Sequence, residues 1–287
     1  MKKNIILLLL ATFFIFPVYS QLKSPAASPK SKIYQEVGLV EIRIDYSRPS
    51  KKGREIFGGL VPLNKIWRTG ANSPTTIFFS EDVKVNNKLI KGGEYHIYSI
   101  PSKSKLDLVI YEKTDAWGSL PSFDESLIKA RLKSDFIKLN NNVETFTISI
   151  SNISNNGASL NIMWDNKLAV YYIDVMTRKK MLDSITETIS NNPSLSDYRK
   201  AAIYYFEENI DINKAVNWID IAFKDSDDLK YWQLRYKALI YEKAGRLDKA
   251  INYAKMGYEK AKLNNAVDGI NSLKNIYNRL KNNQIIY

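Results

Sequence analysis

The hydrophobic repeat changes once along this chain of 287 residues, and that change limits the possible folds more than any other feature. Before about residue 177, apolar and polar residues alternate, as in Val40–Tyr46, where one face is apolar and the other charged. Beyond it, apolar residues recur at helical spacing. We therefore predict a two-domain α+β chain, with an antiparallel β-sandwich or barrel over residues 33–176 and an all-α domain over residues 177–287.

Short runs of strand composition, separated by turn residues, continue the alternating pattern. Asn86 and Asn87 lie between two of these runs and predict a two-residue hairpin turn, because asparagine tolerates a positive φ. Residues 121–137 interrupt the pattern, and we expect a short helix there. The predicted strands after Val40–Tyr46 are Thr75–Ser80, Val83–Val85, Lys88–Ile90, Glu94–Ile100, Leu106–Glu112, Val143–Ser151, Ala158–Trp164 and Leu168–Val175.

The second half of the chain repeats itself. Residues of matching type lie 35 apart in the pairs Ala215 and Ala250, Phe206 and Tyr241, and Ile219 and Ala254. This spacing is close to the roughly 34-residue period of tetratricopeptide helical hairpins, so we expect tetratricopeptide-like repeats over residues 195–263. A plain bundle of α-hairpins is the alternative. Residues 266–281 would then form a capping helix over the last apolar face.

Acidic residues in the second half mark predicted helix ends and one acidic turn. Asp211 and Asp227-Asp228 stand where N-caps are expected. Asp225-Ser226-Asp227-Asp228 resembles the start of a calcium loop, but it lacks the glycine and the distant glutamate of a full loop. We therefore expect a turn between helices there and no metal site.

The first residues have the features of a secretory signal peptide. Lys2 and Lys3 precede an apolar run that is too short to span a bilayer comfortably, and Ser20 provides a small residue for cleavage before Gln21. We expect residues 1–20 to be removed and the protein to be exported, to the periplasm or beyond the cell. A retained membrane anchor is the alternative. Residues 21–32 are small, polar and proline-bearing, which is typical of a linker.

Composition narrows the classes of function. The chain has no cysteine, which excludes disulfides, thiol catalysis, thiolate metal sites and lipid attachment to a cysteine. Its net charge of +12 comes from lysines scattered along the chain rather than clustered. No helix has a basic stripe with interleaved aromatic residues, so we do not expect nucleic-acid binding. After signal cleavage, no stretch is long and apolar enough to be an integral membrane span.

Several motifs occur in order over the first half of the chain. They are Arg48-Pro49, KGREIFGGLVP at residues 52–62, IWRTGAN at residues 66–72, Thr75-Thr76, GGEYHIYSIP at residues 92–101, and Trp117-Gly118. With these motifs the chain resembles the domain of unknown function 2911 family, common in secreted proteins of the Bacteroidetes, over about residues 24–176. The resemblance implies a secreted β-domain, often followed by helical repeats. It supplies no reaction, because the family is functionally uncharacterised.

One departure from this family concerns the end of the IWRTGAN motif. Family members usually have an acidic residue after the asparagine, whereas Ser73 and Pro74 follow Asn72 here. Any metal or proton role of that acid is therefore absent.

The same stretch is the best candidate for a binding site in the β-domain. Trp67 offers a ring on which a sugar could stack, and Arg68 and Arg54 offer forked donors for a carboxylate or phosphate. With Arg48 and Asn72 from the neighbouring motifs, these residues make up the predicted binding set. The alternative is purely structural: Trp67 closes one end of the sandwich, Arg68 bonds loop carbonyls, and Asn72 provides a turn.

The sequence does not indicate a catalytic centre. His96 is the only histidine, and one histidine cannot form a His-rich zinc site. Ser99 should point to the opposite face of the same strand, so no local Ser–His pair is expected. We predict no catalytic residue, no metal and no cofactor.

These observations favour a binding or scaffold protein of the cell envelope over an enzyme. The helical repeats would dock a protein or peptide on their concave surface, with tyrosine and lysine side chains favouring an acidic partner. The first alternative is a β-domain that binds a glycan or a small anionic ligand through Trp67 and its neighbours. An envelope hydrolase is the second alternative.

Overall fold

The computed structural model describes residues 24–224 and 228–284. The predicted signal peptide, with Ser20 and Gln21, lies outside the described residues, as do Asp225 and Asp227 of the acidic turn. The chain divides into two compact units, and the boundary falls between Thr177 and Arg178. We call the first the β unit and the second the helical unit, and describe each by itself.

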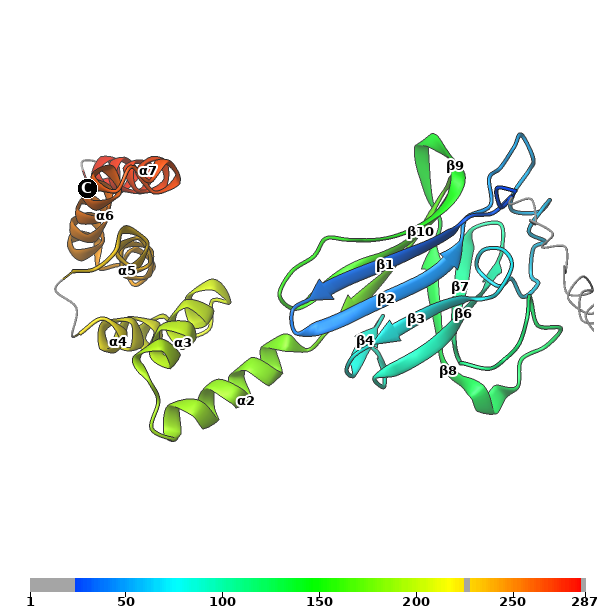
Figure 1. Cartoon of the computed structure of the whole chain (residues 1–287), viewed down its shortest axis with the longest axis horizontal. Coiled ribbons are helices and arrows are strands. Elements are labelled where there is room, and N and C mark those ends of the chain that lie inside the picture. Colours follow the sequence, from blue (N-terminus) through cyan, green and yellow to red (C-terminus); the bar gives the residue numbers. More distant parts are fainter. Residues whose placement is uncertain (1–23, 225–227, 285–287) are drawn as a thin grey trace, which may run out of the picture. The chain divides into compact units, whose positions relative to one another are not determined.

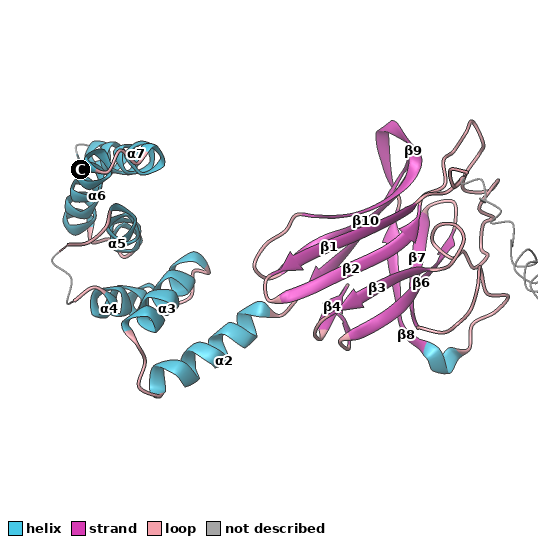
Figure 2. Ribbon diagram, viewed as in Figure 1, coloured by secondary structure: helices cyan, strands magenta, loops and turns pink. Residues whose placement is uncertain are grey.

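The β unit contains two antiparallel sheets (Figures 1 and 2). The order is β1-β2-β3-β6-β7-β8 in the six-stranded sheet and β5-β4-β10-β9 in the four-stranded sheet. The strands are β1 (Lys30–Val37), β2 (Val40–Ser47), β3 (Thr75–Phe79), β4 (Val83–Val85), β5 (Lys88–Ile90), β6 (Gly93–Pro101), β7 (Lys105–Glu112), β8 (Ile128–Asp135), β9 (Ile137–Ser151) and β10 (Gly157–Asp174).

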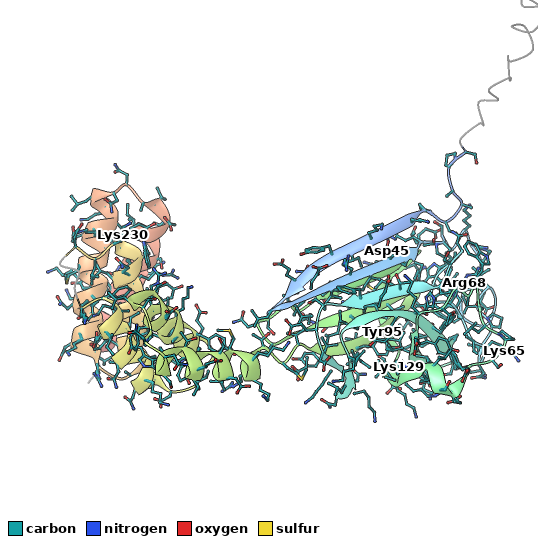
Figure 3. All side chains as sticks on the ribbon, turned by 60° about the horizontal axis from the view of Figure 1, so that its bottom comes forward. Asp45, Lys65, Arg68, Tyr95, Lys129 and Lys230 are labelled. Atoms are coloured by element: carbon teal, nitrogen blue, oxygen red, sulfur yellow. The ribbon has the colours of Figure 1, made fainter. Side chains whose placement is uncertain are left out.

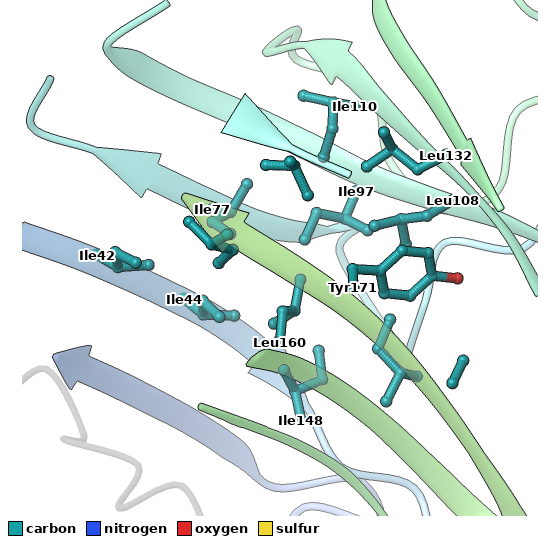
Figure 4. Close-up of a cluster of buried hydrophobic side chains, with 14 of the residues drawn as sticks. Ile42, Ile44, Ile77, Ile97, Leu108, Ile110, Leu132, Ile148, Leu160 and Tyr171 are labelled. Carbon is teal, nitrogen blue, oxygen red and sulfur yellow. The ribbon is translucent and has the colours of Figure 1, made fainter. Parts of the chain in front are cut away.

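The alternating pattern accounts for the core of this unit. In β2, Val40, Ile42 and Ile44 are buried, while the residues between them are partly or fully exposed. Strands of both sheets contribute to a single hydrophobic cluster. Figure 4 shows this convergence, with Ile97 and its neighbours from one sheet facing Leu160 of the other. Burying apolar side chains of both sheets together removes them from water, which is the main stabilising contribution of such a core.

The structure confirms the strands that the sequence predicts, with changes at their ends. Asn86 and Asn87 form the predicted hairpin turn between β4 and β5, with φ of 44° and 64°. The two runs predicted over Ala158–Val175 are one long strand, β10. Register shifts on either side of Asp165 bend its pairing with β9, and Asp165 has a φ of 54°.

Two strands were not predicted. β8 lies within the segment 121–137 that was expected to be helical, where only Glu125–Leu127 forms a short 3-10 turn, η2. Apolar and polar residues do alternate in β8, but the pattern is weak, because Ala130 and Leu132 are its only buried residues. β1 begins at Lys30, inside the segment expected to be a linker, because it pairs with β2 through its backbone rather than through an apolar face.

The described part of the helical unit contains six helices. Helix–helix contacts are most extensive for α3 with α4, α5 with α6, and α6 with α7. No helix within the described residues is long and apolar enough to cross a membrane. The helices are α2 (Thr177–Ser190), α3 (Leu195–Glu207), α4 (Ile212–Ala222), α5 (Tyr231–Lys243), α6 (Leu247–Leu263) and α7 (Val267–Gln284).

The internal repeat is visible in the turns of the helical unit. Ile210 N–H donates to Tyr205 O and Arg246 N–H donates to Tyr241 O, so Tyr205 rather than Phe206 is the counterpart of Tyr241. The first helices of the two hairpins therefore match at a spacing of 36. The second helices begin at Ile212 and Leu247, which keeps the predicted spacing of 35. The first turn is one residue longer.

Helix caps agree with the sequence at one of two sites. Asp211 caps α4 and accepts from the backbone N–H groups of Asn213 and Lys214. Asp228 caps no helix, because the N-cap residue of α5 is Lys230. Asp228 instead forms an ion pair with Lys260 of α6.

Candidate functional site

The IWRTGAN stretch forms a tight loop that leads into β3. Trp67 and Ser99 of β6 exchange both backbone hydrogen bonds, each with an N···O distance of 2.8 Å. Thr69, Gly70 and Asn72 then have φ of 54°, 145° and 61°. A side chain at Gly70 would place its Cβ 2.9 Å from Ser47 O, so glycine is required by both space and conformation.

Buried hydroxyl groups stabilise this loop from within. Thr69 and Ser99 hydroxyls lie 2.9 Å apart, and the Thr75 hydroxyl donates to Thr69 O at 2.5 Å. All three residues are fully buried, so these bonds satisfy polar groups that would otherwise be costly to bury. They explain why the loop keeps a conformation with positive φ at two non-glycine positions.

Trp67 is a residue of the core rather than an open platform. Its side chain is 8% exposed and its indole N–H donates to Gly70 O at 3.0 Å. Trp164 stacks on it at a centroid distance of 5.9 Å, and Phe146 and Phe57 meet it edge-on at 5.1 Å and 6.2 Å. The structural alternative for this residue fits its surroundings better than sugar stacking does.

Two other residues of the predicted set, Arg48 and Asn72, make hydrogen bonds within the β unit. The Arg48 guanidinium bonds Phe146 O at 3.0 Å and the Thr147 hydroxyl at 2.8 Å, which ties the end of β2 to β9. The Asn72 amide donates to the Ser47 hydroxyl at 3.1 Å and to Ser28 O at 3.3 Å. Neither Arg48 nor Asn72 lines a described cavity at this end of the unit.

The remaining residues of the set, Arg54, Trp67 and Arg68, line one pocket with a cavity volume of about 400 Å³. That volume is within the range of roughly 300–1,000 Å³ typical of small-molecule sites. Figure 3 labels Arg68 and Lys65 at the same end of the β unit. The lining is Ala27, Ser28, Pro49, Ser50, Lys52, Arg54, Leu60, Val61, Pro62, Lys65, Ile66, Trp67, Arg68, Gly70, Ala71, Ser119 and Trp164.

Four cationic side chains line this pocket: Lys52, Arg54, Lys65 and Arg68. Arg54 uses two of its donors on Ser50 O and Lys51 O, at 2.6 Å and 2.9 Å. Arg68 Nε is buried without a hydrogen-bond partner in the described part of the chain. A guanidinium with unused donors is a ready partner for a carboxylate or phosphate.

Nearby carboxylates leave this positive charge largely uncompensated. No Asp or Glu is among the described residues that line the pocket. Asp165 is paired with Lys51 at 2.5 Å, and Glu144 accepts from the backbone N–H of Lys52 at 2.7 Å. Lys52, Lys65 and Arg68 form no ion pair within residues 24–224 and 228–284. The pocket therefore presents a positive surface to a ligand.

A loop outside the predicted binding set forms one wall of the pocket. Ser119 lines the pocket, and its hydroxyl accepts the backbone N–H of Arg68 at 3.3 Å. Gly118, with φ of 82°, lies against the Arg68 guanidinium. Lys52 and Lys65 were also missed. Only the Trp117-Gly118 motif hinted at this loop, since the lysines resemble the many solvated lysines elsewhere in the chain.

His96 lies apart from the pocket. It is 4% exposed, and its Nε2 lies 2.8 Å from Thr114 O, so Nε2 carries the proton and donates to this carbonyl. The Ser99 hydroxyl is bonded to Thr69 instead. No described hydrogen bond joins a serine to His96. The bond from His96 to Thr114 O instead fixes the start of the loop that contains Trp117.

The chain matches one family model, described as Protein of unknown function (DUF2911), over residues 28–173. This span is a little over half of the 287 residues and contains the pocket lining from Ser28 onward. No curated protein and no solved structure matches the chain.

Proposed function

The chain belongs to the family described as Protein of unknown function (DUF2911), and from that premise we propose that it is a binding protein whose β unit holds a small anionic ligand. One observation carries the proposal: four cationic side chains and no carboxylate line the pocket within the described residues. Part of the lining is apolar, because Trp67 and Trp164 stack on each other and are buried in the core.

Arg68 is the central residue of this proposal. Its guanidinium lines the pocket, its Nε has no described hydrogen-bond partner, and an anion in the pocket would pair with its charge and bond its terminal nitrogens. Charge-assisted hydrogen bonds of this kind contribute about 1.5–3 kcal/mol each. Arg54 is already held by two backbone carbonyls, so it contributes charge at a fixed position rather than new hydrogen bonds from those donors.

Nuclear magnetic resonance tests the anion site with an internal control. Residues 21–287 would be titrated with inorganic phosphate while the tryptophan indole and arginine Nε signals are followed. The signals of Trp67 and Arg68 should shift and saturate, while that of Trp218 in the helical unit, outside the described cavities, should not. Affinity should fall as salt is raised, because ions screen the attraction.

Two arginine variants decide whether the pocket or the overall charge is responsible. Arg68→Gln should weaken phosphate binding by at least about tenfold. Arg43→Gln is the matched control, because Arg43 lies over the Phe78 ring and pairs with Glu41, away from the pocket. Equal losses in both variants, or no saturable shift of Trp67 and Arg68, would refute the proposed function.

A groove in the helical unit favours a second function, the docking of an acidic peptide segment. The groove has a cavity volume of about 530 Å³ and runs along α2, α3 and α5. Arg199 and Lys200 line it with one acid, Glu207, and the Arg199 guanidinium lies over the Trp232 ring at 5.4 Å. An extended chain with carboxylates and an apolar side chain would complement this surface.

Peptide arrays test this second function. Acidic peptides that contain an aromatic residue should bind residues 21–287, and the double variant Arg199→Ser with Lys200→Ser should lose them. The matched control replaces Lys214 and Lys255, exposed lysines of α4 and α6 outside the groove lining, by serine. Loss in both double variants would indicate charge alone and would exclude the groove.

We also propose a fold type for each unit and the export of the protein. The two sheets with one shared core support a β-sandwich, and the repeated hairpin turns support tetratricopeptide-like repeats. The lysines and apolar run before Ser20 support export to the periplasm or beyond the cell. Mass spectrometry of the protein from its native cells would test export, since cleavage should leave Gln21 as the first residue.

A further inference from the structure

Trp117 is the most exposed of the aromatic side chains described, at 75%. It lies in the loop between β7 and η2, immediately before Gly118, which packs against the Arg68 guanidinium. Two residues further on, Ser119 lines the pocket. The ring has no aromatic or cationic partner within the described residues. Trp117 is therefore an open aromatic surface on the loop that supplies Ser119 to the lining of the positive pocket.

The loop that carries Trp117 is anchored on both sides. Before it, His96 Nε2 donates to Thr114 O at 2.8 Å. After it, the Asp124 N–H donates to the Tyr111 hydroxyl at 3.3 Å, and Phe123 packs on the Tyr111 ring at 5.5 Å. A tryptophan that is three-quarters exposed buries little surface, so it adds little to folding. It is available for a ligand at little ordering cost.

The chemistry next to this ring indicates which ligand fits. An indole face attracts the C–H groups on the face of a pyranose ring. The hydroxyls of such a ring need several hydrogen-bonding partners, and three serines, Ser28, Ser50 and Ser119, are among the residues that line the pocket. The cations beside them need an anion. A sugar ring that bears a negative group satisfies all three requirements at once.

We propose that the pocket binds an anionic sugar, a pyranose that bears a carboxylate or a phosphate. Trp117 stacks on the sugar ring, Arg68 and Lys65 hold the anionic group, and the serine hydroxyls bond the sugar hydroxyls. The proposal rests on the anion site proposed above and names its ligand class. It also transfers the stacking role that the sequence suggested for Trp67 to Trp117.

Calorimetric titration of residues 21–287 with five probes tests this inference. The probes are inorganic phosphate, glucuronate, glucose 6-phosphate, the neutral methyl glucoside and adenosine monophosphate. Glucuronate or glucose 6-phosphate, or both, should bind about tenfold more tightly than phosphate, and methyl glucoside should bind least. Which of the two charged sugars is preferred identifies the anionic group.

Variants at Trp117 separate stacking from charge. Trp117→Ala should weaken the charged sugars by about tenfold and leave phosphate unchanged. Because the ring is exposed, this variant should unfold at the wild-type midpoint. Tyr34→Ala, which removes another exposed aromatic ring from β1, is the matched control and should change neither affinity.

Each other outcome has a definite meaning. If phosphate binds but the charged sugars bind no more tightly, or if Trp117→Ala weakens both equally, the sugar inference is wrong and the anion site stands. If adenosine monophosphate binds most tightly and depends on Trp117, the ligand is a nucleotide and the inference is wrong. If no probe binds, the proposed function falls with it.

Discussion

Trp67 stacks on Trp164, with ring centroids 5.9 Å apart and ring planes at 19°. Trp67 belongs to the loop before β3, and Trp164 to β10 of the other sheet. The two rings therefore join the sheets and form the floor of the positive pocket at the same time. Because the floor belongs to the core, its loss affects folding as well as binding.

Trp67→Ala should destabilise the β unit by about 3–5 kcal/mol, the usual range for removing a large buried aromatic side chain. Urea unfolding followed by circular dichroism measures this change in the free energy of unfolding. Trp67→Phe keeps an aromatic ring and should cost less. If Trp67→Ala unfolded at the wild-type midpoint and lost only phosphate affinity, Trp67 would be a binding residue after all.

Arg48→Met should lower the free energy of unfolding by about 1–3 kcal/mol, because Phe146 O and the Thr147 hydroxyl lose a charged donor. Phosphate affinity should stay unchanged, since Arg48 does not line the pocket. Chemical unfolding and calorimetry on the same variant measure the two effects. Arg43→Met is the control for the lost charge. A stable Arg48 variant with weakened phosphate binding would contradict this assignment.

The strands and turns of the β unit show how much of the fold could be predicted from the sequence. Patterns local to a segment predicted its structure well: the alternation in β2 and the Asn86-Asn87 turn were correct. β8 was missed because alanine at position 130 makes a weak apolar signal. β1 was missed because its place at the sheet edge depends on backbone pairing with β2, which side-chain patterns do not record.

The site was predictable only in part, for a different reason. Arg48, Arg54 and Arg68 look equivalent in the sequence, and long-range pairing decides their roles. Arg48 faces β9, while Arg54 and Arg68 face the pocket. Likewise Trp67 and Trp117 both belong to recognisable motifs, but one is 8% exposed and the other 75%. No local pattern distinguishes the two tryptophans, because burial depends on contacts with strands that are distant in the sequence.

Tyr98→Phe should leave stability at neutral pH unchanged or slightly higher. The Tyr98 side chain is fully buried, and its hydroxyl has no hydrogen-bond partner in the described residues, so removing it leaves no group unsatisfied. Burial, with a smaller effect of Tyr111, raises the pKa of Tyr98 from 10.0 to about 12. The folded state therefore retains a proton that the unfolded chain releases.

This pKa shift predicts how stability depends on alkaline pH. The contribution of Tyr98 is fully present below pH 10 and is lost as the pH rises towards about 12. Stability of Tyr98→Phe should accordingly decline less steeply over this range. Urea midpoints at a series of pH values measure the slope, and Tyr172→Phe, at an exposed tyrosine, is the control. Equal slopes in the wild type and Tyr98→Phe would refute the assignment.

The helix-ending residues of the helical unit predict opposite effects for two substitutions. Gly245 has φ of 71° and Asn265 has φ of 52°, so each ends a helix in the left-handed region. A Cβ at Gly245 would meet no atom within 4 Å, so Gly245→Ala adds only backbone strain, about 1 kcal/mol. Asn265→Gly relieves such strain and should stabilise by up to about 1 kcal/mol.

Thermal melting followed by circular dichroism should therefore show a lower midpoint for Gly245→Ala and a higher one for Asn265→Gly, each by a few degrees. The neighbouring Asn264 is the matched control, because its φ is −92°. Asn264→Gly should not stabilise, since glycine there only adds freedom to the unfolded chain. If both asparagine variants shifted the midpoint equally, loss of the side chain rather than backbone conformation would explain the effect, and the prediction would fail.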